Sequence, residues 1–386
     1  MTAVWPFIPQ MDVVESLEWL TDVFKARKAE YRAALRPMPR IGYQFRYLLD
    51  DFDYGAAREL ARTVGGDPVF VPDWTVATQV PTIGAATVSL PVDVTRAPAY
   101  RVGGSALVFS GNSSYEVVTI SALGTGTITV SATASGYAAP WVVPLRVGTF
   151  TQEFSGDRGP HAYTEGSAVF ECIDTEDLSG VGGGIGYPPY LGDQVITEPT
   201  EIINGVKETN IREVEPVDSK TGPIYKYPIY ASPNQASVLA WECLDATAVW
   251  NRRLWLHSRR GRWKQFWVSS WNADVVITRD ISGGDASIEI AAIGFASKYP
   301  TPTDLAIVAT DGGMWLVRVT GATSGSTGHE LLTLSASFTG SADLAVISKT
   351  CKLTLSRLGS DRIDIQHLPG RQATVVAATK EIPVYP

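Results

Sequence analysis

Apolar and polar residues alternate in short runs along most of the chain, and such alternation predicts half-buried β-strands. The runs are rich in Val, Thr, Ile and Tyr, and Gly, Asn or Asp separates them about every ten residues. Residues 53–66 and 245–261 instead have helical spacing, with Asp at the start and Gly at the end. The pattern therefore predicts a mainly β fold, built as barrels or sandwiches with a few short helices.

The same order of segments occurs twice. Residues 128–136 read ITVSATASG and residues 332–340 read LTLSASFTG, with shared Thr, Ser, Ala and closing Gly. Further matching pairs lie at 106–121 and 306–321, 84–90 and 284–290, and 70–74 and 267–271. A strand-like and then a helix-like segment precede each series, and the offset between matched segments stays between 197 and 204 residues. We infer an internally duplicated unit.

The duplication divides the chain into a first tube-like repeat at residues 1–178 and a second at 193–386. The Gly- and Pro-rich residues 179–192 are expected to be a linker or an extended surface loop. Each repeat is expected to be a framework sheet with a helix, into which a small β-barrel is inserted, at about 76–147 and about 274–348. Hairpin turns are expected at the SGNS and TDGG tips of the barrels and at the late LPGR step.

The two repeats open differently. In the N-terminal arm, residues 1–40, Asp12 and Glu15 resemble a capping box. Three apolar residues would share one face of the helix that follows: Leu17, Leu20 and Phe24. Beyond Lys25 the pattern fits either a continued helix or an edge strand. In residues 201–232, NG and TG steps between alternating residues predict hairpins.

Composition supports a strand-and-turn protein. Charged residues are 19% of the 386 residues while Gly (35) and Pro (24) are abundant, and the length suggests two or three domains. The net charge of -8 means that a nucleic-acid partner would need a local basic face. The dense basic stretch RRGR at 259–262 is expected to solvate a turn, because phosphate binding needs many such charges.

Cysteine usage and the N-terminus bear on the compartment. Cys172, Cys243 and Cys351 form no CxxC motif, which argues against a disulfide framework and favours assembly in a reducing cytoplasm. The opening MTAVWPFIPQMDVV lacks a basic n-region and an apolar core, so we expect no signal peptide. A run of about 18 apolar residues is also missing, so we expect no membrane span.

Residues capable of catalysis are scattered. Four histidines stand without HExxH or GxSxG motifs nearby: His161, His257, His329 and His367. The acidic residues 50–53 are interpreted as a strand end and helix cap, because a Ca²⁺ loop needs spaced oxygens and a Gly turn. Residues 175–178 are interpreted as an acidic edge beside the linker. We therefore expect no catalytic, cofactor-binding or metal site, and no enzyme activity.

Six of the eleven tryptophans lie between residues 241 and 271. Exposed tryptophans could form a sugar-binding platform. The favoured interpretation places Trp250 and Trp255 on the helix, and Trp267 and Trp271 in the core or in a subunit contact.

The stretch EWLTDVFKARKAEYRAALRPMPRIGYQFRYLL, residues 18–49, resembles the start of structural proteins in the tail tips of long-tailed, siphovirus-type bacteriophages. The matching residues are 19–23 (WLTDV), 30–32 (EYR), 39–40 (PR) and the aromatic strand 45–47. GRWKQFWVSSW, residues 261–271, is similar to a Gly-Arg-x-x-x-aromatic-Trp pattern in the same group. The likeness covers most of the chain.

The resemblance implies a distal tail or baseplate-hub component, a virion structural protein assembled in the host bacterium's cytoplasm, without cofactor or catalytic residue. Its partners would be the tail tube, tape-measure, hub and fibre proteins, with DNA only as passing cargo and no membrane. Tail tubes are six-fold and hubs commonly three-fold, so a duplicated chain predicts a ring-forming adaptor, trimeric by preference and hexameric as the alternative.

In such a ring the framework sheets would line an acidic lumen and the inserted barrels would point outward. A carbohydrate- or receptor-binding tail protein, motivated by the tryptophan cluster, is the alternative function.

Overall fold

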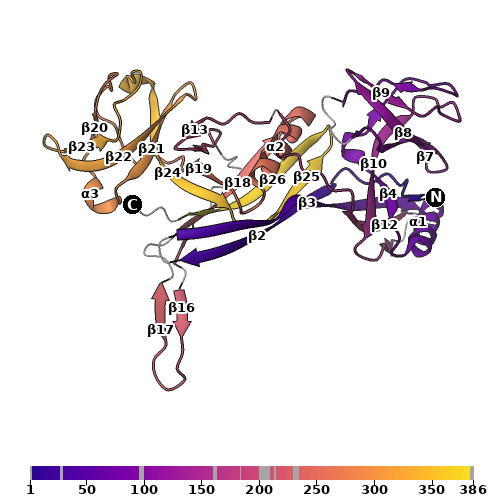
Figure 1. Ribbon diagram of the computed structural model, residues 1–386, viewed down its shortest axis with the longest axis horizontal. Coiled ribbons are helices and arrows are strands. Elements are labelled where there is room, and N and C mark those ends of the chain that lie inside the picture. Colours follow the sequence, from indigo (N-terminus) through magenta and orange to yellow (C-terminus); the bar gives the residue numbers. More distant parts are fainter. Residues whose placement is uncertain are drawn as a thin grey trace.

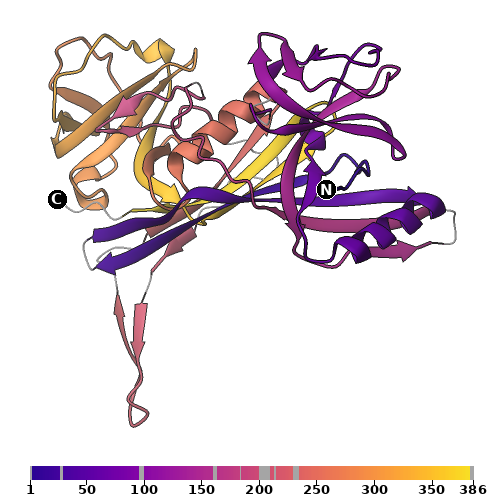
Figure 2. The same ribbon diagram turned by 45° about the vertical axis from the view of Figure 1, so that its right-hand side comes forward.

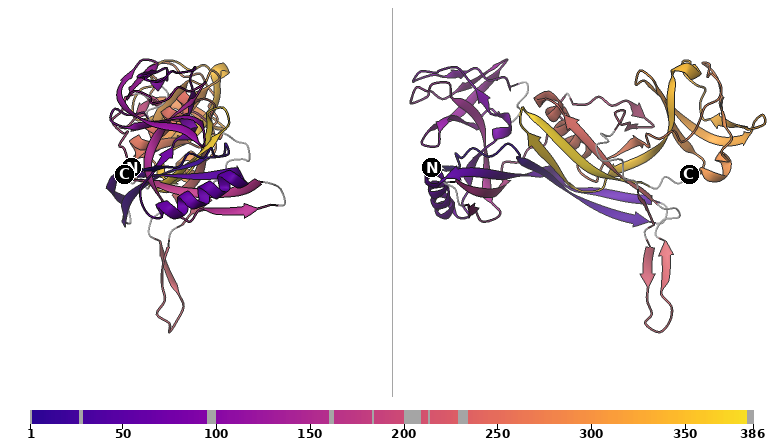
Figure 3. Two further views of the ribbon diagram at one scale, coloured as in Figure 1. Left: turned by 90° about the vertical axis from the view of Figure 1, so that its right-hand side faces the viewer. Right: turned by 180° about the vertical axis from the view of Figure 1, so that it is seen from behind.

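The computed structural model describes residues 2–26, 29–94, 100–159, 163–182, 184–199, 209–212, 214–228 and 234–382. The molecule is elongated and mainly β, with two small β units on one side of a central antiparallel sheet and one hairpin that projects from the other side (Figures 1, 2 and 3). The predicted mainly β class with few helices is confirmed: the described residues contain three α-helices.

The central sheet joins sequence-distant strands. Its neighbouring strands, all antiparallel, are in order β12 (Tyr163–Cys172), β3 (Ala29–Asp50), β2 (Val14–Ala26), β25 (Arg362–Leu368), β26 (Gln372–Glu381) and β18 (Asn234–Cys243). Strand β2 pairs with β3 on one side and with β25 on the other. Strand β2 therefore links the two halves of the chain.

The prediction of a helix in the N-terminal arm is wrong. Val14–Ala26 and Ala29–Asp50 pair as the two strands of a long antiparallel hairpin, β2–β3. Alternate residues are buried in this strand and just before it, in the order Val13, Glu15, Leu17, Trp19 and Thr21, whereas Leu20 and Phe24 are exposed. The helical spacing arose because a buried carboxylate and a buried hydroxyl interrupt the apolar alternation.

The first half continues from β3 into α1 (Asp51–Val64) and then β4 (Val69–Pro72), which pairs with β10 (Trp141–Phe150). Between β4 and β10 lies a small β unit with strands β6 (Ser89–Leu90), β7 (Ser105–Gly111), β8 (Ser114–Gly124) and β9 (Thr127–Val130). In it β7 pairs with β10 and β8, and β9 pairs with β8 and β6. Strand β10 then pairs with β12.

The second half makes pairings in the same order. Strand β18 leads into α2 (Ala246–Arg259) and β19 (Gln265–Ser269), which pairs with β24 (Ile347–Leu358). The strands between them are β20 (Ser287–Ala291), β21 (Thr303–Ala309), β22 (Met314–Ser324) and β23 (His329–Leu334). Here β21 pairs with β24 and β22, and β23 pairs with β22 and β20. Strand β24 then pairs with β26.

The remaining elements are short. They are β1 (Ala3–Val4), η1 (Trp74–Val76), β5 (Thr78–Gln79), β11 (Ser155–Arg158), β13 (Pro189–Tyr190), β14 (Asp193–Gln194), β15 (Thr209–Ile211), β16 (Val214–Val217), β17 (Tyr225–Pro228), α3 (Phe295–Lys298) and η3 (Leu344–Val346). The predicted hairpin turns between β7 and β8, β21 and β22, and β25 and β26 are confirmed. Of the hairpins expected in 201–232, β16–β17 is present, and the NG step lies outside the described residues.

Both long helices are capped by an aspartate: the second by Asp245 as predicted, and the first by Asp50, three residues before the predicted start at Asp53. The Asp50 carboxylate accepts the Asp53 N–H at 2.8 Å, and the Asp245 carboxylate accepts the Ala248 N–H at 2.8 Å. Each bond satisfies an N–H that has no partner within the helix. The first helix ends at Gly65 and the second at Arg260, whose left-handed φ of 54° precedes Gly261.

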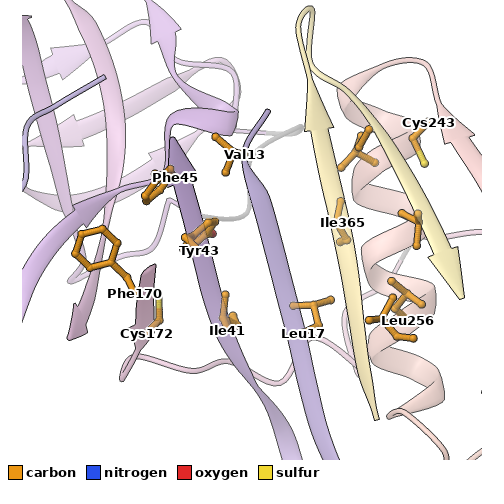
Figure 4. Packing of buried hydrophobic residues seen from close by; sticks show 14 of the residues in the cluster. Val13, Leu17, Ile41, Tyr43, Phe45, Phe170, Cys172, Cys243, Leu256 and Ile365 are labelled. Carbon is orange, nitrogen blue, oxygen red and sulfur yellow. The ribbon is translucent and has the colours of Figure 1, made fainter. Parts of the chain in front are cut away.

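One hydrophobic core spans both halves and includes residues of the central sheet and of α2. Leu17 of β2 lies opposite Ile41 of β3 in the register, and Ile365 of β25 and Leu256 of α2 belong to the same core on its other side (Figure 4). Trp5 is fully buried in the same core and donates its indole N–H to the Tyr47 hydroxyl at 2.8 Å. The two small β units each have a separate core.

The segment 179–192 was expected to be a linker or surface loop, but its described part packs against the second half of the molecule. Tyr187 is buried and contacts Trp255 edge to face, and the Tyr190 carbonyl accepts the Trp267 indole N–H at 3.0 Å. The described part of this segment therefore covers the second half of the molecule instead of only bridging two repeats.

Candidate assembly interface

A buried ionic cluster fixes strand β2 to the second half of the chain. Glu15 of β2 is 2% exposed, and its carboxylate accepts hydrogen bonds from Arg253 of α2 and from Nε2 of His367 on β25. Burial raises the pKa of Glu15, but Arg253 and His367 outweigh that effect and hold the pKa at about 2. The carboxylate is therefore charged, and it ties together three elements from both halves.

A second polar group extends this cluster into the first half. The Tyr43 hydroxyl donates to Asp73 at 3.1 Å, and Arg146 lies 3.3 Å from the Asp174 carboxylate. Burial, and after it Asp73, raises the pKa of Tyr43 well above its ordinary value, so the phenol is a neutral donor. Apart from the partly exposed Asp174 the cluster is buried, so its charges fix the two halves together instead of facing solvent.

The distal end of the β2–β3 hairpin is anchored on its inner face. Glu30 makes a bidentate ion pair with Arg357 of β24 at 2.6 and 3.0 Å, and Arg32 donates to Gln265 of β19 at 2.6 Å. Both partners belong to the second half. The hairpin therefore presents a fixed outer face to solvent.

That outer face is unusually apolar. Phe24 and Tyr31 are directly opposite each other in the register and are 58% and 68% exposed. Leu20 and Leu35 are also exposed on this hairpin. Aromatic side chains left uncovered on a rigid sheet are typical of protein contact surfaces.

The arm hairpin, β16–β17 with its turn (residues 214–228), is the second exposed apolar element. It forms a separate two-stranded sheet and projects away from the body (Figures 1 and 2). The register places four side chains on one face, the aromatic face: Glu215, Val217, Tyr225 and Tyr227. Val217, Tyr225 and Tyr227 are 47%, 60% and 59% exposed, so nothing in the described part of the chain covers them.

An apolar groove of about 370 Å³ lies at the junction of the first small unit with the central sheet. Its walls come from the chain before β2, from η1, from β10 and from the β25–β26 turn. The residues that define it are Ile8, Met11, Trp74, Trp141, Leu368 and Arg371. Arg371 holds the groove together, because its guanidinium donates to the Ala77 carbonyl at 2.8 Å and to the Thr78 hydroxyl at 3.2 Å.

Residues with possible chemistry are used structurally. His257 is buried and accepts the Leu178 N–H at 3.4 Å, His329 contacts Thr278, and His367 bonds Glu15; His161 lies outside the described residues. Within the described part of the chain, no group of three or more His, Cys, Asp or Glu side chains gathers as a metal site. All three cysteines are free and buried.

The acidic runs behave as the sequence indicated, but the basic run differs. Asp50 caps α1, and in the acidic edge Glu176 pairs with Arg101 at 3.1 Å. The 259–262 stretch does form a turn after α2, yet Arg259 is buried, and Arg262 donates from Nε and Nη2 to Oδ2 of Asp361 at 3.0 and 2.9 Å. The turn is a structural junction, so its interpretation as a solvated basic run is wrong.

The tryptophans do not gather on one open face. Trp241, Trp255 and Trp267 are buried, and Trp250, Trp263 and Trp271 are only partly exposed. Trp263 lies beneath Arg260 and Lys264, and Lys349 lies over Trp271. The expected positions of Trp250 and Trp255 on the helix are confirmed.

Sequence reasoning found neither the exposed aromatic faces nor the groove. The TG step indicated a hairpin, but exposure depends on what the rest of the chain covers. The sequence matches no protein-family model and no curated protein with which it was compared. None of the described helices has the length and apolar content needed to cross a bilayer.

Proposed function

We propose that this chain is a non-enzymatic structural protein that assembles into a ring and serves as an adaptor at the distal end of a bacteriophage tail. In that role it joins the tail tube to hub or fibre proteins. The observation that carries the proposal is the series of strand pairings made in the same order in each half. It supports an internal duplication of a framework sheet, helix and inserted small barrel.

Duplication gives the ring its geometry. Three chains supply six similar units, which suits a junction between a six-fold tube and a three-fold hub. The ionic cluster around Glu15 and Arg253 supports this proposal, because it locks the two units of one chain in a fixed relation. A fixed angle between successive units is what a closed ring requires.

The uncovered surfaces supply the contacts. A ring needs complementary, non-identical faces on each subunit, and apolar residues at their centres. Phe24, Tyr31, Tyr225 and Tyr227 are exposed aromatics on two hairpins that extend from the body. The low proportion of charged residues, 19%, also favours protein contacts.

The experiment is native mass spectrometry of the purified full-length chain, combined with negative-stain electron microscopy. The expected result is a closed ring of three chains, with six similar masses around the axis. A hexamer of chains would retain the ring and change its stoichiometry. A chain that remains monomeric at all concentrations up to about 100 μM would overturn the proposal, since contacts weaker than that cannot hold a particle together.

A further inference from the structure

We infer that the arm hairpin of one copy docks with its aromatic face in the apolar groove of a second copy of this chain. This inference rests on the ring proposed above, and it names the two surfaces that meet.

The arm needs a partner because it lacks a core. An isolated two-stranded hairpin is marginally stable in water. Here Val217, Tyr225 and Tyr227 lie on one face, each about half exposed or more, while Lys226 lies on the other. The arm points away from the side of the sheet that carries the small β units and the β25–β26 turn (Figures 1 and 3). The arm of one chain therefore points away from the side on which that chain's own groove lies.

The groove has the size and character to receive this face. Its volume of about 370 Å³ lies within the ~300–1,000 Å³ range of protein binding pockets. Ile8 and Met11 on its wall are 50% and 58% exposed, and Trp141 is also exposed. Large apolar side chains lining an open groove are stabilised when a partner covers them.

Charge selects this pairing over other apolar contacts. Glu215 is the charged residue among the four that make up the aromatic face. Arg371 is the exposed cation on the groove wall, and its hydrogen bonds to the described residues Ala77 and Thr78 both use its Nη2 atom. An arginine carries five N–H donors, so the others are able to meet a carboxylate. An ion pair between Glu215 and Arg371 would orient the arm in the groove.

The arrangement also gives the correct symmetry. The arm and the groove are different surfaces of one chain, so their contact is head-to-tail. Head-to-tail contacts build rings when the rotation closes, whereas two identical surfaces would stop at a dimer.

Analytical ultracentrifugation of the full-length chain tests the inference with matched variants. Tyr225→Ser with Tyr227→Ser is expected to weaken self-association at least about thirtyfold, as loss of two central aromatics does. Lys226→Ser, on the opposite face, is the control and should leave self-association unchanged. Glu215→Arg and Arg371→Glu should each weaken it about tenfold, and the double variant should recover most of that loss.

The outcomes separate this inference from the proposed function. Rings that form equally well with both tyrosines replaced would overturn the arm-in-groove contact while leaving the ring intact. Self-association that is unchanged by Glu215→Arg, a variant that leaves the groove intact, would likewise overturn the pairing of the arm with this groove. A wild-type chain that never associates would overturn both proposals.

Discussion

The Glu15 carboxylate accepts a hydrogen bond from Nε2 of His367 at 2.9 Å, across 352 residues of sequence. Arg253, from a third element, donates to the same oxygen. A residue near the start of the chain thus bonds one close to its end, and the two strands that carry them, β2 and β25, are paired in the central sheet. The cluster is buried, so each member depends on the other two for its charge balance.

Replacement of Glu15 by glutamine tests that dependence. Glu15→Gln keeps the side-chain shape but leaves the buried Arg253 without a counter-charge, so we expect the free energy of unfolding to fall by about 3–5 kcal/mol. Urea denaturation followed by tryptophan fluorescence measures it. Glu18→Gln is the control, because Glu18 on the same strand is 43% exposed and faces Arg36 at 3.4 Å, a pair worth less than about 1 kcal/mol. Equal losses for both variants would contradict a structural role for the cluster.

His257 predicts a pH dependence of stability. Burial, and next the charge on Arg253, lower the pKa of His257 from 6.5 to about 4. Between these two pH values the unfolded chain binds a proton that the folded chain does not, so stability falls as the pH drops from about 6.5 to about 4. The full shift in the pKa of His257 corresponds to a loss of about 3 kcal/mol in the free energy of unfolding.

The measurement is the free energy of unfolding at pH 7 and pH 4.5 for wild type and His257→Gln. The variant should lose less stability on acidification than wild type does. Identical slopes for wild type and His257→Gln would show that another group titrates.

Local patterns predicted the strands and the two long helices, because those signals are contained within a few residues. Asp50 and Asp245 stand at helix starts where any capped helix would place them. The β2–β3 hairpin was missed because Glu15 occupies a core position. A buried glutamate looks polar in the sequence, and its partner Arg253 is 238 residues away.

The candidate interface was beyond sequence reasoning for a different reason. The groove is assembled from four separate parts of the chain, among them Ile8, Trp141 and Arg371. Exposure of Tyr225 and Tyr227 likewise depends on where the arm points, which no local pattern encodes. Tyrosines in alternating strands usually mark a buried or half-buried face, so their sequence context suggested ordinary packing.

Thiol reactivity gives an independent check on the core. Burial raises the pKa of Cys172 to about 12 and that of Cys351 to about 11, and it also raises the pKa of Cys243. We therefore expect Ellman's reagent at pH 8 to detect no thiol in the folded protein and all three cysteines in urea. Val217→Cys is the matched positive control, because its thiol on the exposed arm should react at once. Rapid reaction of a native cysteine would mean that a buried strand opens.

Alanine substitutions at two glycines with left-handed backbone conformation distinguish the cost of backbone strain from the cost of steric crowding. Gly312 has φ 87° and open space where an added Cβ would lie, so Gly312→Ala should cost only the backbone strain of about 1–2 kcal/mol. Gly261 has φ 62°, and an added Cβ would lie 2.5 Å from Asp361 Oδ1. That carboxylate accepts the Arg262 and Thr21 N–H groups at 2.9 and 2.8 Å, so displacing it disrupts the junction of β2 with the second half. Gly261→Ala should therefore destabilise the protein by at least about 1 kcal/mol more than Gly312→Ala in urea denaturation. Equal costs would mean that Asp361 moves aside freely and that the turn after α2 does not hold the N-terminal strand.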